Sequence, residues 1–76
     1  MRIISQDGLT DVQYEHSLLN VKKNGEIYAF LYTDISRDNG ISLGKYKDEE
    51  KAKIILARIS AHYGARQSVY RMPQTW

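Results

Sequence analysis

The sequence predicts a single α+β domain, in which one helix packs on one face of an antiparallel sheet of four to five strands. Two observations support this fold class. Apolar residues recur at spacings of three and four only between residues 47 and 64, which is the periodicity of one helix face. The segments before it are short apolar runs separated by Asp-Gly and Asn-Gly, which are turn signals of β-hairpins. A helix with one apolar stripe needs a surface to cover, and these strands would provide it.

Length and composition limit what the chain can be. A chain of 76 residues allows one domain, 1–76, with a modest core, and small domains without disulfides often gain stability by oligomerisation. The absence of cysteine excludes disulfides and thiolate metal ligands. The net charge of +2 is too small to imply nucleic-acid binding by itself. With no signal peptide and no apolar stretch of membrane-spanning length, a cytoplasmic protein with no membrane contact is expected.

Three short strands are expected outside the central part of the chain. Each is bounded by turn-forming residues or by proline, which ends a strand. They cover residues 2–5, 41–46 and 69–72. Residues 9–14 are either a returning strand or an extended connection, and residues 34–40 form a loop.

The clearest hairpin joins residues 15–23 to residues 26–33. Asn24-Gly25 between them suits a two-residue type I′ turn, which needs positive φ at both positions. This turn would fix the register and hence the side chains on each face. The face predicted to lie under the helix carries Ser17, Leu19, Val21, Tyr28, Phe30 and Tyr32. The other face carries Leu18, Ile27, Ala29 and Leu31. Because a solvated face should be more polar, we expect either the chain itself or another subunit to cover this second face, and a homo-oligomer interface is the leading hypothesis.

The helix has clear start and stop signals. The carboxylate of Asp48 can accept hydrogen bonds from the free amides of the first turn, and Glu49 and Glu50 favour the positive end of the helix dipole. Gly64 can adopt the left-handed conformation that closes a helix. The predicted core contains Ile4, Leu19, Val21, Tyr28, Phe30, Ile41, Leu43, Ala52, Ile55, Leu56, Ile59 and Val69.

No arrangement of residues in the sequence indicates catalysis or metal binding. His16 and His62 are the only histidines, and neither lies at a ligand spacing from other candidate ligands. The acidic residues are explained as turn formers and as charges at the helix start. We therefore expect no catalytic residues, no metal and no cofactor.

Basic residues on and after the helix are candidate contacts for phosphate groups of DNA, RNA or a small nucleotide. The candidates are Lys47, Lys51, Lys53, Arg58, Arg66 and Arg71, with Tyr70. A solvated helix face would also carry such residues. The alternating Tyr28, Phe30 and Tyr32 are spaced as base-stacking aromatics are, but core packing beneath the helix is the simpler interpretation.

Three stretches of the chain resemble a known group. The opening MRIISQDG, the stretch GKYKDEEKA at residues 44–52 and the closing YRMP at residues 70–73 resemble small proteins of unassigned function encoded by phages, prophages and mobile elements of Gram-positive bacteria. That group has no established catalytic residues to transfer. The resemblance implies an accessory protein of a phage or mobile element, in the host-cell cytoplasm if phage-encoded. Such proteins often act by binding a host enzyme or defence complex, or by sequestering a signalling nucleotide.

Three functions therefore stand as alternatives. The leading hypothesis is a non-enzymatic binding protein that antagonises a host protein or defence pathway as a homo-oligomer. The second is sequestration of a nucleotide-type signalling molecule at a subunit interface. The third is a small nucleic-acid-binding regulator.

Overall fold

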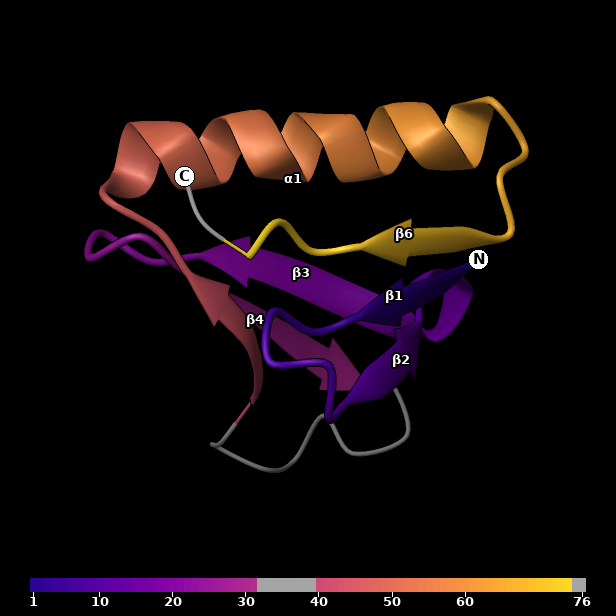
Figure 1. Cartoon of the computed structure of the whole chain (residues 1–76), viewed down its shortest axis with the longest axis horizontal. Coiled ribbons are helices and arrows are strands. Elements are labelled where there is room, and N and C mark those ends of the chain that lie inside the picture. The colour runs from indigo at the N-terminus through magenta and orange to yellow at the C-terminus, as the bar shows by residue number, and fades with distance from the viewer. Residues whose placement is uncertain (32–39, 75–76) are drawn as a thin grey trace.

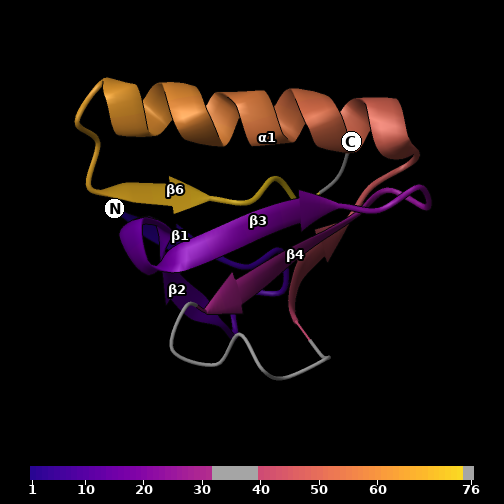
Figure 2. The same ribbon diagram turned by 180° about the vertical axis from the view of Figure 1, so that it is seen from behind.

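One helix lies across two three-stranded sheets in the computed structural model, which describes residues 1–31 and 40–74. Helix α1 (Glu49–Gly64) covers both sheets, with β1 and β6 on one side of the molecule (Figure 1) and β3 and β4 on the other (Figure 2). The strands are β1 (Arg2–Ile4), β2 (Asp11–Gln13), β3 (Ser17–Val21), β4 (Glu26–Leu31), β5 (Ile41–Lys45) and β6 (Val69–Arg71), and a short 3-10 turn, η1 (Tyr14–His16), precedes β3. The predicted α+β class is confirmed.

The strands form two sheets and not the single antiparallel sheet that the sequence predicted. In the first sheet, of order β2-β1-β6, β1 pairs antiparallel with β2 and parallel with β6. The second sheet, of order β3-β4-β5, is antiparallel throughout. The parallel pair arises because the chain passes through α1 before β6 enters beside β1, and a parallel neighbour requires such a long crossover. A pattern of apolar residues does not reveal this pairing, since β1 and β6 have only three residues each.

Helix α1 begins as the sequence predicts and ends differently. The side chain of Asp48 accepts a hydrogen bond from the backbone N–H of Lys51 at 2.9 Å, which is an N-cap. At the other end Gly64 is the last helical residue, and Arg66 is the residue with positive φ, at 61°. The prediction that Gly64 closes the helix in the left-handed conformation is wrong, because the chain reverses two residues later.

We expect the substitution Asp48→Ala to destabilise the protein by about 1 kcal/mol, the usual cost of losing an N-cap side chain. The loss would be measured as the change in the free energy of urea-induced unfolding. Asp48→Asn is the matched control, because an asparagine oxygen can accept the same bond from Lys51. Equal destabilisation by the two variants would show that the cap is not what stabilises this end of α1.

The β3–β4 hairpin has a three-residue loop instead of the predicted two-residue turn. The N–H of Lys22 donates to the carbonyl of Glu26 at 2.8 Å, and Gly25, at φ 90°, donates its N–H to the carbonyl of Lys22 at 3.0 Å. Val21 therefore lies opposite Ile27. Compared with the predicted register, β4 is shifted by one residue, and such a shift moves every side chain of the strand to the other face.

The shift decides which residues of β4 enter the core. Ile27 and Ala29 have no exposed surface, whereas Tyr28 and Phe30 point to the opposite side of the sheet and are partly buried. The prediction that Tyr28 and Phe30 lie beneath the helix is therefore wrong. The core consists of Ile3, Val12, Ile27, Ala29, Leu43, Tyr46, Ala52, Ile55, Ile59, Tyr70 and Met72. The predicted core positions Leu43, Ala52, Ile55 and Ile59 are confirmed, and Leu19, Val21 and Ile41 pack against the core while partly buried.

The four residues predicted to form an interface on the second face of the hairpin do not form one exposed surface. Ile27 and Ala29 are fully buried within the chain, and Leu31 packs partly buried against the core. Leu18 lies on the opposite side of the sheet and is 50% exposed. The chain itself thus covers Ile27, Ala29 and Leu31, which is one of the two explanations that the sequence left open.

Candidate protein-binding surface

The side of the second sheet that faces away from α1 carries aromatic and apolar side chains. Leu18 lies opposite Phe30, Asn20 lies opposite Tyr28, and Tyr28 lies opposite Ser42. The alternation of side chains along a strand adds Lys22 to the same side. We call this set the outer face, and its members are Leu18, Asn20, Lys22, Tyr28, Phe30 and Ser42.

The outer face holds its aromatic rings in a fixed arrangement. The rings of Tyr28 and Phe30 stack with centroids 6.5 Å apart, and the Lys22 ammonium lies 4.5 Å from the centroid of the Tyr28 ring. The Tyr28 hydroxyl donates a hydrogen bond to Glu26 at 3.1 Å, which raises the pKa of that phenol. The cation over the Tyr28 ring and the hydrogen bond from its hydroxyl both restrict this side chain, which reduces the entropy that it would lose on binding a partner.

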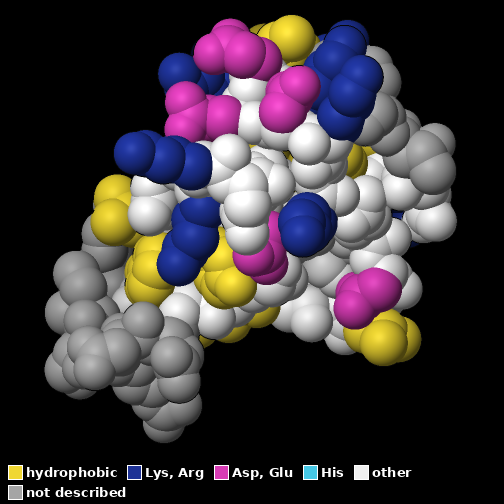
Figure 3. Space-filling view, turned by 90° about the vertical axis from the view of Figure 1, so that its left-hand side faces the viewer, with side chains coloured by type: hydrophobic (Ala, Val, Ile, Leu, Met, Phe, Trp, Pro, Cys, Tyr) yellow, Lys and Arg dark blue, Asp and Glu magenta, His cyan; other side chains and the backbone are white. Residues whose placement is uncertain are grey.

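Part of this surface is open to solvent. Leu18 is 50% exposed, which is high for a leucine flanked by aromatic side chains. Figure 3 shows hydrophobic side chains beside Lys and Arg side chains at the middle left, bordering the grey atoms. Such a mixture of apolar centre and charged margin is typical of protein-binding surfaces.

Strand β3, at one border of the outer face, has a free edge among the described residues. In an antiparallel pair, alternate residues exchange hydrogen bonds with the neighbouring strand. Lys22 bonds to Glu26, so the backbone groups of Leu18 and Asn20 also face β4. The N–H and C=O groups of Leu19 and Val21 therefore point to the side where β3 has no neighbouring strand.

The opposite edge of the same sheet is closed. The N–H of Gln6 donates to the carbonyl of Leu43 at 2.7 Å, and its side-chain oxygen accepts from the N–H of Lys45 at 3.0 Å. Gln6 thus occupies the outward backbone groups of β5 as a short extra strand would. The two edges of this sheet differ, and the edge of β3 is the one that can accept another strand.

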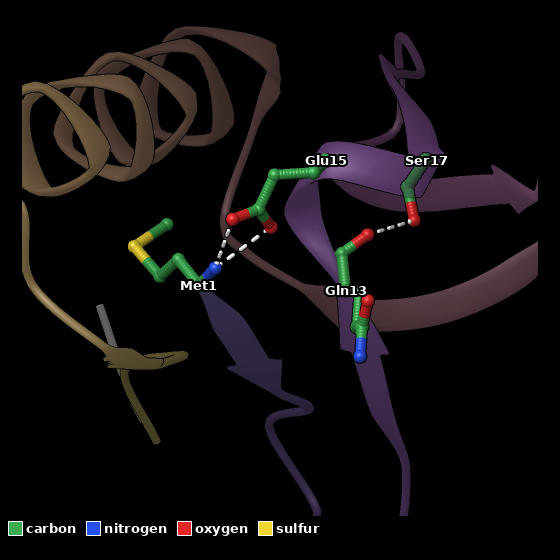
Figure 4. Close-up of polar contacts among 4 residues, drawn as sticks. All are labelled: Met1, Gln13, Glu15 and Ser17. Carbon is green, nitrogen blue, oxygen red and sulfur yellow. Dashed lines mark hydrogen bonds and ion pairs between the residues drawn. The ribbon is translucent and has the colours of Figure 1, made fainter.

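The η1 turn determines where β3 begins (Figure 4). The Ser17 hydroxyl donates to the carbonyl of Gln13 at 2.7 Å, and the Ser17 N–H donates to the carbonyl of Tyr14. Beside it, the N-terminal amine of Met1 contacts both carboxylate oxygens of Glu15, at 2.7 and 2.5 Å. The hydrogen bond from this amine lowers the pKa of Glu15.

The ion pair between the Met1 amine and Glu15 leads to a prediction about the effect of pH on stability. Because the folded-state pKa of Glu15 lies below its unfolded value, the stability it contributes is present above about pH 4.5 and is lost as the pH falls through the folded pKa. We expect the wild-type protein to be more stable than Glu15→Gln at neutral pH. Urea unfolding of both proteins from neutral to acid pH should show this difference disappearing. A difference that persists in strong acid would mean that Glu15 acts through packing and not through its charge.

A groove of about 580 Å³ runs between the edge of β3 and α1. Its helix side is formed by Leu56, Ser60 and Tyr63, whose spacings of four and three place them on one side of the helix. Tyr14 also lines the groove, and its ring contacts the Tyr63 ring in a tilted arrangement with centroids 4.8 Å apart. The groove is therefore bounded by a mostly apolar helix stripe on one side and by a free strand edge on the other.

The predicted phosphate-contact residues do not converge on one site. Lys47 precedes α1 and Arg66 follows it, and a helix of 16 residues separates them by about 24 Å. Lys53 pairs with Glu49 at 3.2 Å and lies 3.7 Å from Glu50, which offsets its charge. The stacking candidate Tyr70 is buried, with the His62 ring edge-on at 4.7 Å between centroids. The remaining candidates are Lys51 and Arg58 on α1 and Arg71 on β6.

Among the described residues, no group of three His, Asp or Glu side chains could hold a metal ion. The burial of Tyr46 raises the pKa of its hydroxyl to about 12, and this hydroxyl donates to the Pro73 carbonyl at 2.8 Å. The group is thus used in packing the C-terminal segment against the core. Within residues 1–31 and 40–74, no helix is long and apolar enough to cross a membrane.

The fold and surface define a small α+β domain with an aromatic outer face and, within the described part of the chain, a strand edge without a neighbour. Comparison with protein-family models, curated proteins and solved structures finds no significant match. The function is therefore inferred from the geometry of these surfaces.

The outer face could not be recognised from the predicted register, because that register places β4 one residue away from its observed position. Two signals could have located this face. Ile27 and Ala29 were recognised as too apolar for a solvated surface, and Lys23-Asn24-Gly25 also fits a three-residue loop that ends in a left-handed glycine. Together they favour Ile27 in the core and Tyr28 outside it.

Proposed function

We propose that this chain is a small non-enzymatic binding protein of a phage or mobile element, which antagonises a host protein through its outer face. The observation that carries the proposal is the exposed Leu18 beside the stacked rings of Tyr28 and Phe30. Aromatic side chains are enriched at the centres of protein interfaces, because they combine a large contact area with little loss of conformational freedom.

The outer face has the composition that such a contact needs. Leu18 and the two rings supply an apolar centre, and Lys22 and Asn20 supply a polar margin on the same strand. Tyr28 is held by Glu26 and Lys22 before binding, so a partner does not have to order it. A surface of this kind can bind tightly without any catalytic residue.

A pair of leucine variants tests the proposal. Leu18 lies on the outer face, whereas Leu9, which is 86% exposed, lies in the turn between β1 and β2. Immobilised wild-type protein would be used to isolate a partner from host extract, and the affinity of the purified partner would then be measured for Leu18→Asp and Leu9→Asp. We expect Leu18→Asp to weaken binding by roughly tenfold or more and Leu9→Asp to leave it unchanged. Equal affinity of the two variants would remove the outer face as the binding surface.

A second candidate function is the binding of single-stranded nucleic acid. The observation that favours it is the position of Tyr28 and Phe30 side by side on an outward-facing strand, with Lys22 beside them. Bases stack on aromatic side chains in this way, and lysine neutralises phosphate. Fluorescence anisotropy with labelled oligonucleotides should then show binding that weakens steeply with salt and is reduced in Phe30→Ala. No binding at low salt would eliminate this function. Nucleotide sequestration has no comparable support, since its candidate residues lie apart.

A further inference from the structure

We propose that the free edge of β3 is a contact surface between two copies of this chain, which pair antiparallel through it to form a symmetric dimer. The inference concerns assembly and stands whichever partner the outer face binds. It replaces the predicted interface, because Ile27 and Ala29 are buried inside each copy.

Strand β3 has backbone hydrogen-bonding groups that the described residues do not use. Leu19 and Val21 direct their N–H and C=O groups away from β4, and no backbone or side-chain group of the described residues bonds to them. Leu19 and Val21 lie two residues apart, and alternate residues of a strand direct their backbone groups to the same edge. With a two-fold axis at Leu19, the N–H and C=O of Leu19 in the two copies bond to each other, and the Val21 N–H of each copy reaches the carbonyl of Ser17 in the other.

The sequence of β3 lacks the features that normally prevent edge pairing. Natural edge strands carry lysine, proline or a bulge, whereas Ser17–Val21 reads Ser-Leu-Leu-Asn-Val and has none of these. The other outward edge of this sheet is closed by Gln6, as described above. An unprotected edge that persists beside a protected one indicates that the first edge has an occupant.

The charges at the two ends of β3 favour a second copy in the antiparallel orientation. Glu15 precedes the strand, and Lys22 and Lys23 follow it. A two-fold axis at Leu19 places Lys23 of each copy near Glu15 of the other, whose carboxylate also contacts the amine of its own Met1, and keeps the lysines of the two copies at opposite ends. A parallel arrangement would instead bring four lysines together. The edge is therefore complementary to itself in one orientation, which is the requirement for a two-fold symmetric interface.

The groove beside β3 fits the same arrangement. Antiparallel pairing of two β3 strands places both α1 helices on one side of the joined sheet. The stripe formed by Leu56, Ser60 and Tyr63 then faces the same stripe of the second copy, and the groove of about 580 Å³ becomes the space between the helices. On the opposite side, the two outer faces join into one surface with Leu18 at the junction.

A pair of double variants tests the register. With the axis at Leu19, Leu18 of one copy lies opposite Asn20 of the other, and both side chains are exposed. In the variant with Leu18→Lys and Asn20→Lys, a lysine of one copy faces a lysine of the other at each of these two positions. The variant with Leu18→Lys and Asn20→Asp opposes lysine to aspartate. Both variants lack the Leu18 side chain, and they differ only at position 20, where the charge is positive in one and negative in the other. Their mass would be measured by light scattering and analytical ultracentrifugation, and thermal unfolding would check that each is folded.

We expect the wild type and the Lys/Asp variant to be dimers and the Lys/Lys variant to be a folded monomer. Amide hydrogen exchange should show Leu19 and Val21 protected in the dimers and exchanging rapidly in the monomer. A monomeric wild type at its highest soluble concentration would overturn the inference. So would a dimer in which the Leu19 and Val21 amides exchange rapidly, since its interface would lie elsewhere. Protection that appears only when a different protein is added would assign the edge to that protein.

Discussion

Replacing Gly25 with alanine is expected to destabilise the fold strongly. Gly25 closes the β3–β4 loop at φ 90°, a conformation that costs an alanine roughly 1–2 kcal/mol. A Cβ atom at this position would also lie 2.4 Å from the backbone oxygen of Tyr46 and 3.0 Å from that of Asp48. These atoms belong to the connection between β5 and α1, so relieving the overlap would displace the start of the helix. Small domains are stable by only about 5–15 kcal/mol, and we expect a loss of about 3 kcal/mol or more.

Gly8 provides the matched control for this experiment. It also has positive φ, at 75°, but a Cβ atom there would meet nothing within 4 Å. Gly8→Ala should therefore lose only the conformational cost of roughly 1–2 kcal/mol. The two variants would be compared by urea unfolding and by far-ultraviolet circular dichroism. Similar losses in both would show that the loop does not pack against the Tyr46 carbonyl.

The second large effect is expected from two neighbouring residues of β4. Ile27 is fully buried in the core, whereas Tyr28 lies on the outer face and is partly buried. We expect Ile27→Ala to lose about 2–5 kcal/mol of unfolding free energy, which is the usual cost of such a truncation in a core. Tyr28→Ala removes a partly exposed ring and its contact with Lys22, and we expect it to lose less than about 2 kcal/mol.

The order of these two losses identifies the face of β4 that packs beneath α1. The register with the three-residue loop requires the larger loss at Ile27. The register with a two-residue turn would require it at Tyr28, because every side chain of β4 would change face. Denaturant unfolding of both variants, with wild type as reference, decides between them. A larger loss at Tyr28 would remove the outer face and the function proposed for it.

Much of the local structure could be predicted from the sequence alone. The helix start was predictable because the Asp48 carboxylate needs only the backbone amides of the first helical turn, such as that of Lys51, and these lie within three residues. The stripe that buries Ala52, Ile55 and Ile59 follows from helical periodicity. The strand pattern and the position of the hairpin follow from the turn residues, and these features together establish the α+β class.

The candidate site could not be predicted in the same way. The outer face depends on one choice between a two-residue and a three-residue loop at Asn24-Gly25, and short-range propensities allow both. The structure shows that the carbonyl oxygen of Gly25 also accepts a hydrogen bond from the N–H of Tyr46 at 3.0 Å. That contact joins residues far apart in the chain, so no local pattern reveals it.

The sequence by itself determined the elements: one capped helix, short strands, a central hairpin and an apolar set that needed cover. These depend on interactions between residues within a few positions of each other. Only the tertiary structure decided that β6 lies parallel to β1, that Ile27 and not Tyr28 enters the core, and that Gln6 closes one edge while β3 has no neighbouring strand among residues 1–31 and 40–74. These outcomes depend on contacts between distant residues, where several arrangements satisfy the same local pattern and packing selects one.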